Sequence, residues 1–379
     1  MSSVLIIAGE NSGEKYGAEL VHQFQKLQPE VNFYGIGGNR MQQEGVRLLY
    51  SVDALSLVGL VEILTHIPRI KSIFKRIRSE IHSTPPQAAV LIDSPDFNLR
   101  LAKVLKKQNI PVLYYISPTV WAWRKGRLKS IKRYVNRMML IFPFEEKIFA
   151  AADIPAVFVG HPLLESISTS LTREEFCQMY RLDPGKPLIA LLPGSRPSEI
   201  ENHMPVLLET IAALGKKRDV QFLLLQAEHL NPENLRKALA SVSDEVLMLD
   251  SHHYEALSAS DLALSACGTA NLEAALLGTP VIAFYRISPL TYLLGKPFVT
   301  IPHYSIVNIM AGRKVIPEFI QKDFSADNLC RSALEILEDN KLRADMLGEL
   351  SRLKGMLGAK KASENAALEL SRICGKPTQ

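Results

Sequence analysis

The chain has 379 residues, more than a single hydrophobic core usually organises, so we expect two domains. Hydrophobic residues make up 47% and charged residues 22%, as in ordinary globular proteins, and no apolar run is long enough to span a bilayer. A net charge of +5 is too small to indicate nucleic acid, and neither the four cysteines nor the nine histidines show a metal-ligand spacing. The start of the chain lacks the basic region of a signal peptide, so we expect a cytoplasmic protein. We also expect the protein to need no metal or other cofactor.

The first predicted strand, residues 4–8, leads into a loop with three glycines spaced four residues apart, and then into a helix. This spacing is neither the dinucleotide-binding pattern nor a P-loop. Glu10 and Glu14 would repel a phosphate group. The loop residues Glu10, Ser12 and Gly13 are therefore predicted to bind a neutral, hydroxyl-rich ligand such as a sugar.

Apolar residues recur with a helical period over residues 57–74. The apolar stripe that they form is wider than one core contact requires, and basic residues end the segment. Pro68 predicts a kink or two shorter helices. Two interpretations stay open: a core-facing helix, or an amphipathic surface that enters an anionic membrane. The membrane-facing candidates are Val61, Ile63, Leu64, Ile67 and Ile70.

The predicted strand at 88–92 is followed at once by Asp93. Ligands of open α/β sheets bind beyond the carboxyl ends of the strands, so Asp93 is our candidate general base, with a turn-forming aspartate as the alternative. Asp96 lies just before a helix, where N-capping is a sufficient explanation.

Both tryptophans, Trp121 and Trp123, follow the predicted strand at 112–116 and precede a basic run that ends at Arg137. Such a pattern can stack bases, anchor at lipid headgroups or be a solvated helix face. His161 follows the last strand of this half and is either a ligand contact or a turn residue. The pattern then turns polar, and we place the domain boundary at 168/169.

The second half opens with a buried-strand pattern at 188–192, a turn that contains Gly194, Ser195 and Arg196, and a helix. A strand, a glycine turn and a helix present backbone N–H groups to an anion, and a guanidinium in the turn suits bidentate binding of phosphate. Further strands are predicted at 221–225, 246–249, 262–265 and 280–283, with helices between them, which indicates a second parallel sheet.

A second candidate site follows the strand at 262–265. Gly268 and Thr269 begin a helix whose N–H groups can face a diphosphate, and Glu273 lies one turn further, where it can accept hydrogen bonds from a ribose diol. A later stretch of this half has polar residues between its apolar ones. The same ligand is predicted to be lined by three of them, Asn308, Arg313 and Gln321.

Several motifs resemble the lipid-A-disaccharide synthase family, a group of glycosyltransferases with the GT-B arrangement, in order and over nearly the whole chain. They are Ala8-Gly9-Glu10-Asn11-Ser12-Gly13, Ile92-Asp93-Ser94-Pro95-Asp96-Phe97-Asn98, Ser117-Pro118-Thr119-Val120-Trp121-Ala122-Trp123-Arg124, Leu192-Pro193-Gly194-Ser195-Arg196, Gly268-Thr269-Ala270 and Ala311-Gly312-Arg313. Glu14 and Cys267 depart from the family pattern, where Asp and Ser are usual.

The resemblance implies an α/β fold of two Rossmann-like parallel-sheet domains facing a cleft, residues 1–168 and 169–354, with the last helix, about 355–379, crossing back to the first domain. It implies metal-independent, inverting transfer from UDP-2,3-diacylglucosamine to 2,3-diacylglucosamine 1-phosphate (lipid X), which gives a β-1′,6-linked disaccharide 1-phosphate and UDP. Asp93 would be the base and Arg196 would stabilise the departing UDP. The enzyme would associate peripherally with the inner membrane, and a homodimer is left open. A UDP-sugar epimerase and a nucleotide-regulated membrane-surface binding protein without turnover are the alternatives.

Overall fold

In the computed structural model the chain divides into two compact units, Met1–Glu165 with Leu357–Gln379, and Ser166–Met356. The structure describes residues 2–56, 63–227, 230–240, 242, 245–296, 299, 301–359 and 361–375. Our sequence boundaries at 168/169 and about 355 compare with 165/166 and 356/357. Each unit is described by itself below.

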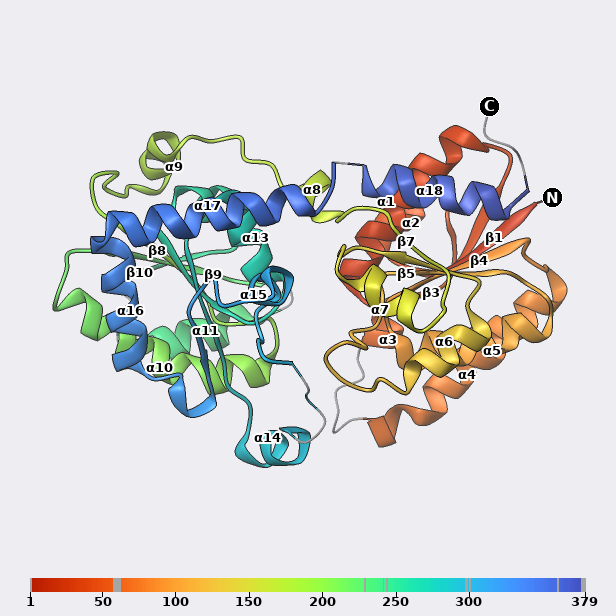
Figure 1. Cartoon of the computed structure of the whole chain (residues 1–379), viewed down its shortest axis with the longest axis horizontal. Helices are drawn as coiled ribbons and strands as arrows, with labels where there is room; N and C mark the ends of the chain where they lie inside the picture. Colours follow the sequence, from red (N-terminus) through yellow and green to blue (C-terminus); the bar gives the residue numbers. More distant parts are fainter. Residues whose placement is uncertain are drawn as a thin grey trace. The chain divides into compact units, whose positions relative to one another are not determined.

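The first unit is built on a seven-stranded parallel sheet in the order β3-β2-β1-β4-β5-β6-β7 (Figure 1). Its strands are β1 Ser3–Ala8, β2 Asn32–Gly37, β3 Arg47–Ser51, β4 Ala88–Ile92, β5 Val112–Tyr115, β6 Arg137–Leu140 and β7 Ala156–Phe158. The order reverses between β1 and β4, so the carboxyl ends of these two strands flank the switch point where open α/β sheets bind their ligands.

Helices cover both faces of this sheet, since alternate residues of a buried strand point to opposite sides. One face packs α4 Ile63–Ser83, α5 Pro95–Lys107, α6 Arg127–Tyr134 and α7 Glu145–Ala151. The other packs α1 Asn11–Leu27, α2 Asn39–Gln43 and α18 Ala362–Ile373. The short helices α3 Asp53–Ser56 and α8 Leu163–Ser166 complete the unit up to its boundary.

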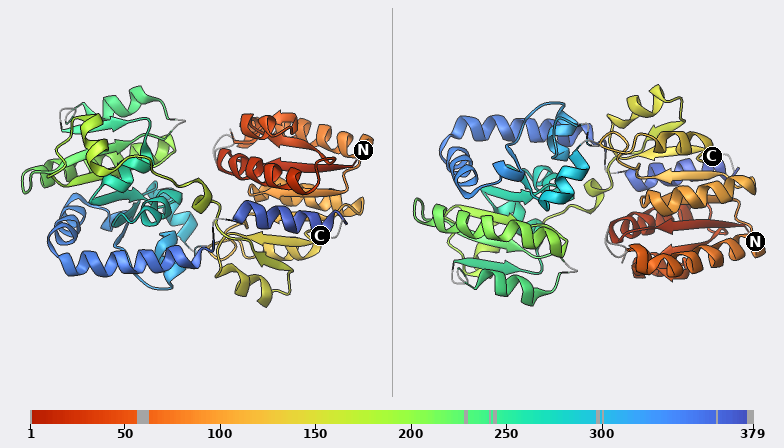
Figure 2. Two further views of the ribbon diagram at one scale, coloured as in Figure 1. Left: turned by 90° about the horizontal axis from the view of Figure 1, so that it is seen from above. Right: turned by 90° about the horizontal axis from the view of Figure 1, so that it is seen from below.

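The C-terminal helix α18 packs on α1, as Figures 1 and 2 show. Ala366, Ala367 and Leu370 are fully buried in the same core cluster as Phe24 of α1. The Gln28 side-chain amide also donates to the Ser371 hydroxyl at 3.0 Å. The last helix of the chain is therefore part of the core of the first unit.

The second unit is a six-stranded parallel sheet in the order β10-β9-β8-β11-β12-β13. Its strands are β8 Leu188–Leu192, β9 Gln221–Leu225, β10 Val246–Leu249, β11 Leu262–Ala266, β12 Val281–Tyr285 and β13 Glu318–Ile320. Its helices are α9 Arg173–Tyr180, α10 Pro197–Gly215, α11 Pro232–Leu239, α12 His253–Ala259, α13 Thr269–Leu277, α14 Pro289–Gly295, α15 Ile306–Ala311, the 3-10 helix η2 Gln321–Asp323, α16 Ala326–Glu338 and α17 Asn340–Met356. The switch point here lies between β8 and β11.

The predicted fold class, two Rossmann-like parallel-sheet domains, is confirmed. In the described part of the chain no helix combines the length and the apolar character needed to cross a membrane.

Candidate functional site

Asp93 lies at the switch point of the first sheet, directly after β4. Its backbone is left-handed, with φ of 49°, and its N–H donates to Tyr115 O at 3.1 Å. Burial, together with the charge of Glu10 just after neighbouring β1, raises the pKa of its carboxyl group to about 6, although a backbone hydrogen bond and the charge of Arg127 act to lower it. A carboxylate whose pKa approaches neutrality at a switch point has the properties of a general base.

The three glycines of the first loop make α1 fit against β4. A Cβ on Gly9 would lie 2.0 Å from the Ser94 side chain, and one on Gly13 would lie 3.2 Å from Ile92. Gly17 faces the same isoleucine at 3.0 Å. The absence of a side chain at Gly13 thus has a packing reason, and its contact with a sugar stays a prediction.

The acidic residues of this loop have separate roles. Glu10 is exposed beside Asp93, while Glu14 is buried and accepts the Met41 N–H at 3.0 Å in the first turn of α2. Glu14 thus stabilises a helix N-terminus, which explains an acidic residue at that position. The side chain of Ser12 lies outside the described residues.

Asp96 does not cap α5 as predicted, because Ser94 occupies the N-cap position. Its carboxylate instead pairs with Arg127 at 2.9 Å and with Arg124 at 3.2 Å. Both guanidinium groups lie over the Trp123 ring, at 5.3 and 4.4 Å from its centre. Part of the basic run is therefore neutralised within the unit.

Trp121 belongs to an aromatic cluster at the same sheet edge. Its ring meets Phe144 edge-on at 5.5 Å, Phe144 stacks on Phe142, and Phe142 lies 5.0 Å from His161. His161 is 3% exposed and accepts the Leu163 N–H at 3.2 Å, so it is a turn residue rather than a ligand contact. Buried Glu145 accepts a hydrogen bond from the Trp121 indole N–H. Sequence reasoning missed Glu145 because its hydrogen-bond partners come from another turn.

The turn after β8 presents Ser195 and Arg196 at the surface of the second unit. Glu199, a residue that sequence reasoning missed, accepts both of their N–H groups, at 2.8 and 3.2 Å. Gly194 has φ of 124° and passes so close to Glu199 that a Cβ there would lie 2.5 Å from its carboxylate. Because these two amides are already used, a phosphate contact from Ser195 or Arg196 comes from their side chains, above all the exposed Arg196 guanidinium.

His203, also missed, fastens this turn to the end of β12. Its Nδ1 lies 2.6 Å from Pro193 O, and its Nε2 accepts the Arg286 N–H at 3.0 Å. This pattern fits the neutral Nδ1–H tautomer, and burial lowers the pKa of the ring accordingly. The hydrogen bond from the Arg196 N–H to Glu199 is the glutamate half of a capping box, and a glutamate three residues into a helix can anticipate it.

Gly268 and Thr269 are exposed at the start of α13, next to the Arg196 turn because β8 and β11 are paired. A Cβ on Gly268 would meet no atom within 4 Å, so the helix N-terminus is open. Glu273 is half-buried and accepts a hydrogen bond from the Tyr254 hydroxyl at 3.4 Å. Burial raises the pKa of the Cys267 thiol, which is therefore neutral.

Of the remaining predicted ligand contacts of the second unit, that of Asn308 is wrong, while Gln321 and Arg313 have partners within the unit and their ligand contacts stay predictions. Asn308 is fully buried, and its amide makes four hydrogen bonds, to Val315, Ile316 (two) and Glu318. The Gln321 amide, oriented to satisfy both of its groups, exchanges two 3.2 Å hydrogen bonds with the backbone of Ile287. Arg313 pairs with Glu349 of α17 at 2.6 Å. All three side chains are bound by the protein itself.

Of the predicted membrane-facing residues, Val61 lies outside the described residues, as do the side chains of Ile63, Leu64 and Ile67. Ile70 is partly buried and packs against the core together with the fully buried Ile77, which favours the core-facing alternative for this residue. Helix α4 continues through Pro68 and is a core-facing helix from residue 70 onward. Its outer face is cationic, with exposed Lys71 and Lys75.

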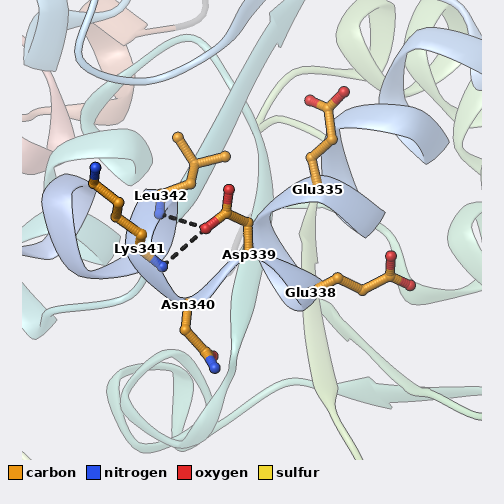
Figure 3. Close-up of a pocket in the computed structure, with 6 residues that line it drawn as sticks. All are labelled: Glu335, Glu338, Asp339, Asn340, Lys341 and Leu342. Carbon is orange, nitrogen blue, oxygen red and sulfur yellow. Dashed lines mark hydrogen bonds between the residues drawn. The ribbon is translucent and has the colours of Figure 1, made fainter.

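A shallow hollow in the second unit lies at the junction of α16 and α17 (Figure 3). It is lined by Glu335, Glu338, Asp339, Asn340, Lys341 and Leu342. Asp339 accepts the N–H groups of Lys341 and Leu342, both at 2.9 Å, which is the usual task of a residue before a helix. The hollow includes none of the switch-point residues. In the described ranges no three His, Cys, Asp or Glu side chains are grouped to hold a metal ion.

Two doubly wound parallel sheets, each with polar residues at its switch point, define a two-domain α/β protein of the GT-B type. A family model described as lipid-A-disaccharide synthetase matches residues 4–370. The chain therefore belongs to the lipid-A-disaccharide synthase family and is a glycosyltransferase of lipid A biosynthesis.

Full-length relatives agree with this assignment. The lipid-A-disaccharide synthase of Geobacter sulfurreducens is 40% identical over 374 residues, which cover 98% of this chain and 97% of that protein. That of Syntrophus aciditrophicus is 41% identical over 367 residues, 96% of each. Among solved structures, UDP-GlcNAc 2-epimerase from Neisseria meningitidis bound to UDP-GlcNAc has a TM-score of 0.67 at 13% identity, covering 98% of this chain and 100% of that chain. This likeness shows the shared fold.

Proposed function

We propose that the protein transfers 2,3-diacylglucosamine from UDP to the 6-hydroxyl group of 2,3-diacylglucosamine 1-phosphate, without a metal and with inversion. The acceptor oxygen forms a bond to the anomeric carbon while the bond from that carbon to the UDP oxygen breaks. UDP leaves with the electron pair, and the acceptor proton goes to Asp93. The products are a β-1′,6-linked disaccharide 1-phosphate and UDP.

Asp93 is the observation that carries this proposal, since it combines a switch-point position with a pKa raised to about 6. The exposed Arg196 guanidinium and the open N-terminus of α13 at Gly268 and Thr269 stabilise the charge that grows on UDP. Glu273 lies one turn into α13 and is assigned to the ribose.

Incubation with both lipid substrates should release UDP and form the disaccharide. Asp93→Asn should lower kcat by about 10²–10⁴-fold, the usual contribution of a positioned base. Asparagine tolerates the left-handed backbone, so the variant should fold. Asp153→Asn is the matched control, because Asp153 is an exposed aspartate with φ of 53°. Near-normal turnover of Asp93→Asn would reject the base assignment.

The UDP-sugar epimerase is the competing enzyme, because solved epimerases share the fold. An epimerase would convert the UDP-sugar into an isomer without needing the lipid acceptor. Product analysis with the donor alone separates the two: an isomer of the donor would contradict the transfer reaction, whereas acceptor-dependent UDP release supports it.

We further propose that the enzyme associates with the inner membrane surface through the outer face of α4, α5 and α6. Residues 63–134 hold fifteen Lys and Arg but three Asp and Glu, whereas the whole chain holds 44 and 39. Anionic lipids attract such a face by about 1 kcal/mol per basic residue. The charges, rather than the apolar side of α4 that packs in the core, support this proposal.

Charge reversal tests it. Lys71→Glu with Lys75→Glu should weaken sedimentation with phosphatidylglycerol-containing vesicles by at least about 10-fold. Lys216→Glu with Lys217→Glu, an exposed pair in the second unit, is the matched control. A third variant with serine at Val61, Leu64 and Ile67 tests whether apolar residues insert. Equal sedimentation of the wild type, the α4 variant and the serine variant would end the membrane proposal.

A further inference from the structure

A buried carboxyl group at the start of α7 takes no part in the reaction as proposed. Glu145 is 2% exposed, and its Oε1 accepts hydrogen bonds from the Ser117 hydroxyl and from the Trp121 indole N–H, the latter at 3.2 Å. Its Oε2 accepts the Phe142 N–H at 3.4 Å. This single side chain therefore joins the turn after β5 to the turn after β6.

Burial and hydrogen bonds, rather than charged side chains, shift the pKa of Glu145 among the described residues. Its hydrogen-bond partners are neutral, and His161, which packs on Phe142, is neutral because burial lowers its pKa to about 3. Burial raises the pKa of Glu145 to about 7, even though its hydrogen bonds with Ser117, Trp121 and Phe142 act in the opposite direction. Both protonation states of Glu145 are thus accessible near neutral pH.

The segment that Glu145 holds, residues 117–123, lies in the chain between two residues that act on Asp93, Tyr115 and Arg127. It follows Tyr115, which pairs with Ile92 and accepts the Asp93 N–H. It continues into Arg127, whose positive charge lowers the pKa of Asp93. A displacement of this segment therefore changes both the surface next to the base and the charge that acts on it.

Building on the proposed function, we propose that Glu145 is a positioning residue for the transfer reaction, which holds residues 117–123 and Arg127 in the arrangement that binds the acceptor beside Asp93. The ionised carboxylate accepts from Ser117 and Trp121 at once. A protonated carboxyl group donates one hydrogen bond, and the Ser117 hydroxyl then turns to the Pro118 carbonyl, which lies 3.2 Å away. The hold on the segment is stronger in the ionised state.

Steady-state kinetics provide the first test. Glu145→Gln keeps the shape of the side chain and removes the charge. We expect KM for the acceptor to rise about 10-fold, the loss typical of a charge-assisted hydrogen bond, and KM for the UDP-sugar to stay within about 2-fold. The acidic limb of the pH profile of kcat/KM should shift as Arg127 moves relative to Asp93. Glu146→Gln, on the exposed next residue of the same helix, should change neither.

Fluorescence tests the contact without turnover, since the chain has two tryptophans. In a Trp123→Phe background the remaining indole is Trp121, and its emission should titrate with a midpoint near pH 7. Adding Glu145→Gln should abolish this titration. If Glu145→Gln does not fold, Ser117→Ala takes its place in the kinetic test, again with a raised acceptor KM expected.

An acceptor KM equal to that of the wild type, or an emission titration that persists without the Glu145 carboxyl group, overturns the proposal. Failure of the wild type to form disaccharide overturns the proposed function instead, and the emission titration still tests Glu145.

Discussion

At the scale of single residues, the candidate base is placed where it costs stability. Burial and the Glu10 charge raise the pKa of Asp93 from 3.8 to about 6, so the folded state binds more protons than the unfolded state between these two pH values. Stability contributed by protonated Asp93 is therefore present at low pH and is lost as the pH rises toward 6. Such a conflict between stability and function is typical of catalytic groups.

We therefore expect Asp93→Asn to be more stable than the wild type at pH 8, by about 1–3 kcal/mol, while it loses activity. The advantage should shrink below pH 6 and vanish below about pH 4, where wild-type Asp93 is protonated in both states. Thermal melting of both proteins across this range measures the difference. Equal melting temperatures at pH 8 would contradict a raised pKa.

The same pKa predicts the pH dependence of the reaction. Because the base must be ionised, kcat/KM should fall about tenfold per pH unit below about pH 6. Activity measurements between pH 5 and pH 8 test this, with Asp153→Asn as the control for stability. An acidic limb centred near pH 4 would show that Asp93 titrates as an ordinary aspartate.

Sequence position alone was enough to propose Asp93 and Arg196 as candidates, because both follow a strongly apolar strand, fully buried in β4 and buried up to half-buried Leu192 in β8. It could not select Glu199, His203 or Glu145, whose importance depends on contacts with other turns. It also misplaced Asn308, since a polar side chain looks the same in sequence whether it binds a ligand or the backbone.

At the scale of elements, the turn after β8 is stabilised by Glu199 in the helix that follows it, α10. Glu199→Ala should leave the N–H groups of Ser195 and Arg196 without an acceptor and cost about 1–2 kcal/mol of stability. The freed turn should also raise KM for the UDP-sugar. The stability of Glu199→Gln and its KM for the UDP-sugar should lie between those of Glu199→Ala and the wild type, because the glutamine amide oxygen can still accept a hydrogen bond.

Glu201→Ala, an exposed glutamate on the same helix, is the control and should change neither melting nor KM. An unchanged KM for the UDP-sugar in Glu199→Ala would show that the position of Arg196 does not depend on this clamp.

The elements that the sequence predicts best are the buried strands. β4 and β8 agree with our predicted limits because their apolar runs are bounded by turn residues. β3 and β13 were missed, since both are edge strands with half-exposed side chains, and β13 has three residues. Their pairing depends on neighbours far along the chain, which a local pattern cannot show.

At the scale of the whole molecule, a substitution in the core of α18 should lower the stability of the first unit alone. Leu370→Ala removes a fully buried side chain and should cost about 2–5 kcal/mol. Both tryptophans lie in the first unit, so tryptophan fluorescence reports its unfolding. Leu353→Ala, a buried leucine of α17, is the matched control and should shift the circular-dichroism transition of the second unit. Equal effects of both variants on fluorescence would contradict this division.

The return of the last helix also sets the order in which the protein can mature on the ribosome. The second unit has its complete sequence once residue 356 has emerged, whereas the half that is made first still lacks the cover over Leu20 and Phe24. Domains usually fold in the order of their synthesis. Here the half that is translated earliest is completed latest, and a nascent chain stalled near its end would present an uncovered apolar surface to chaperones.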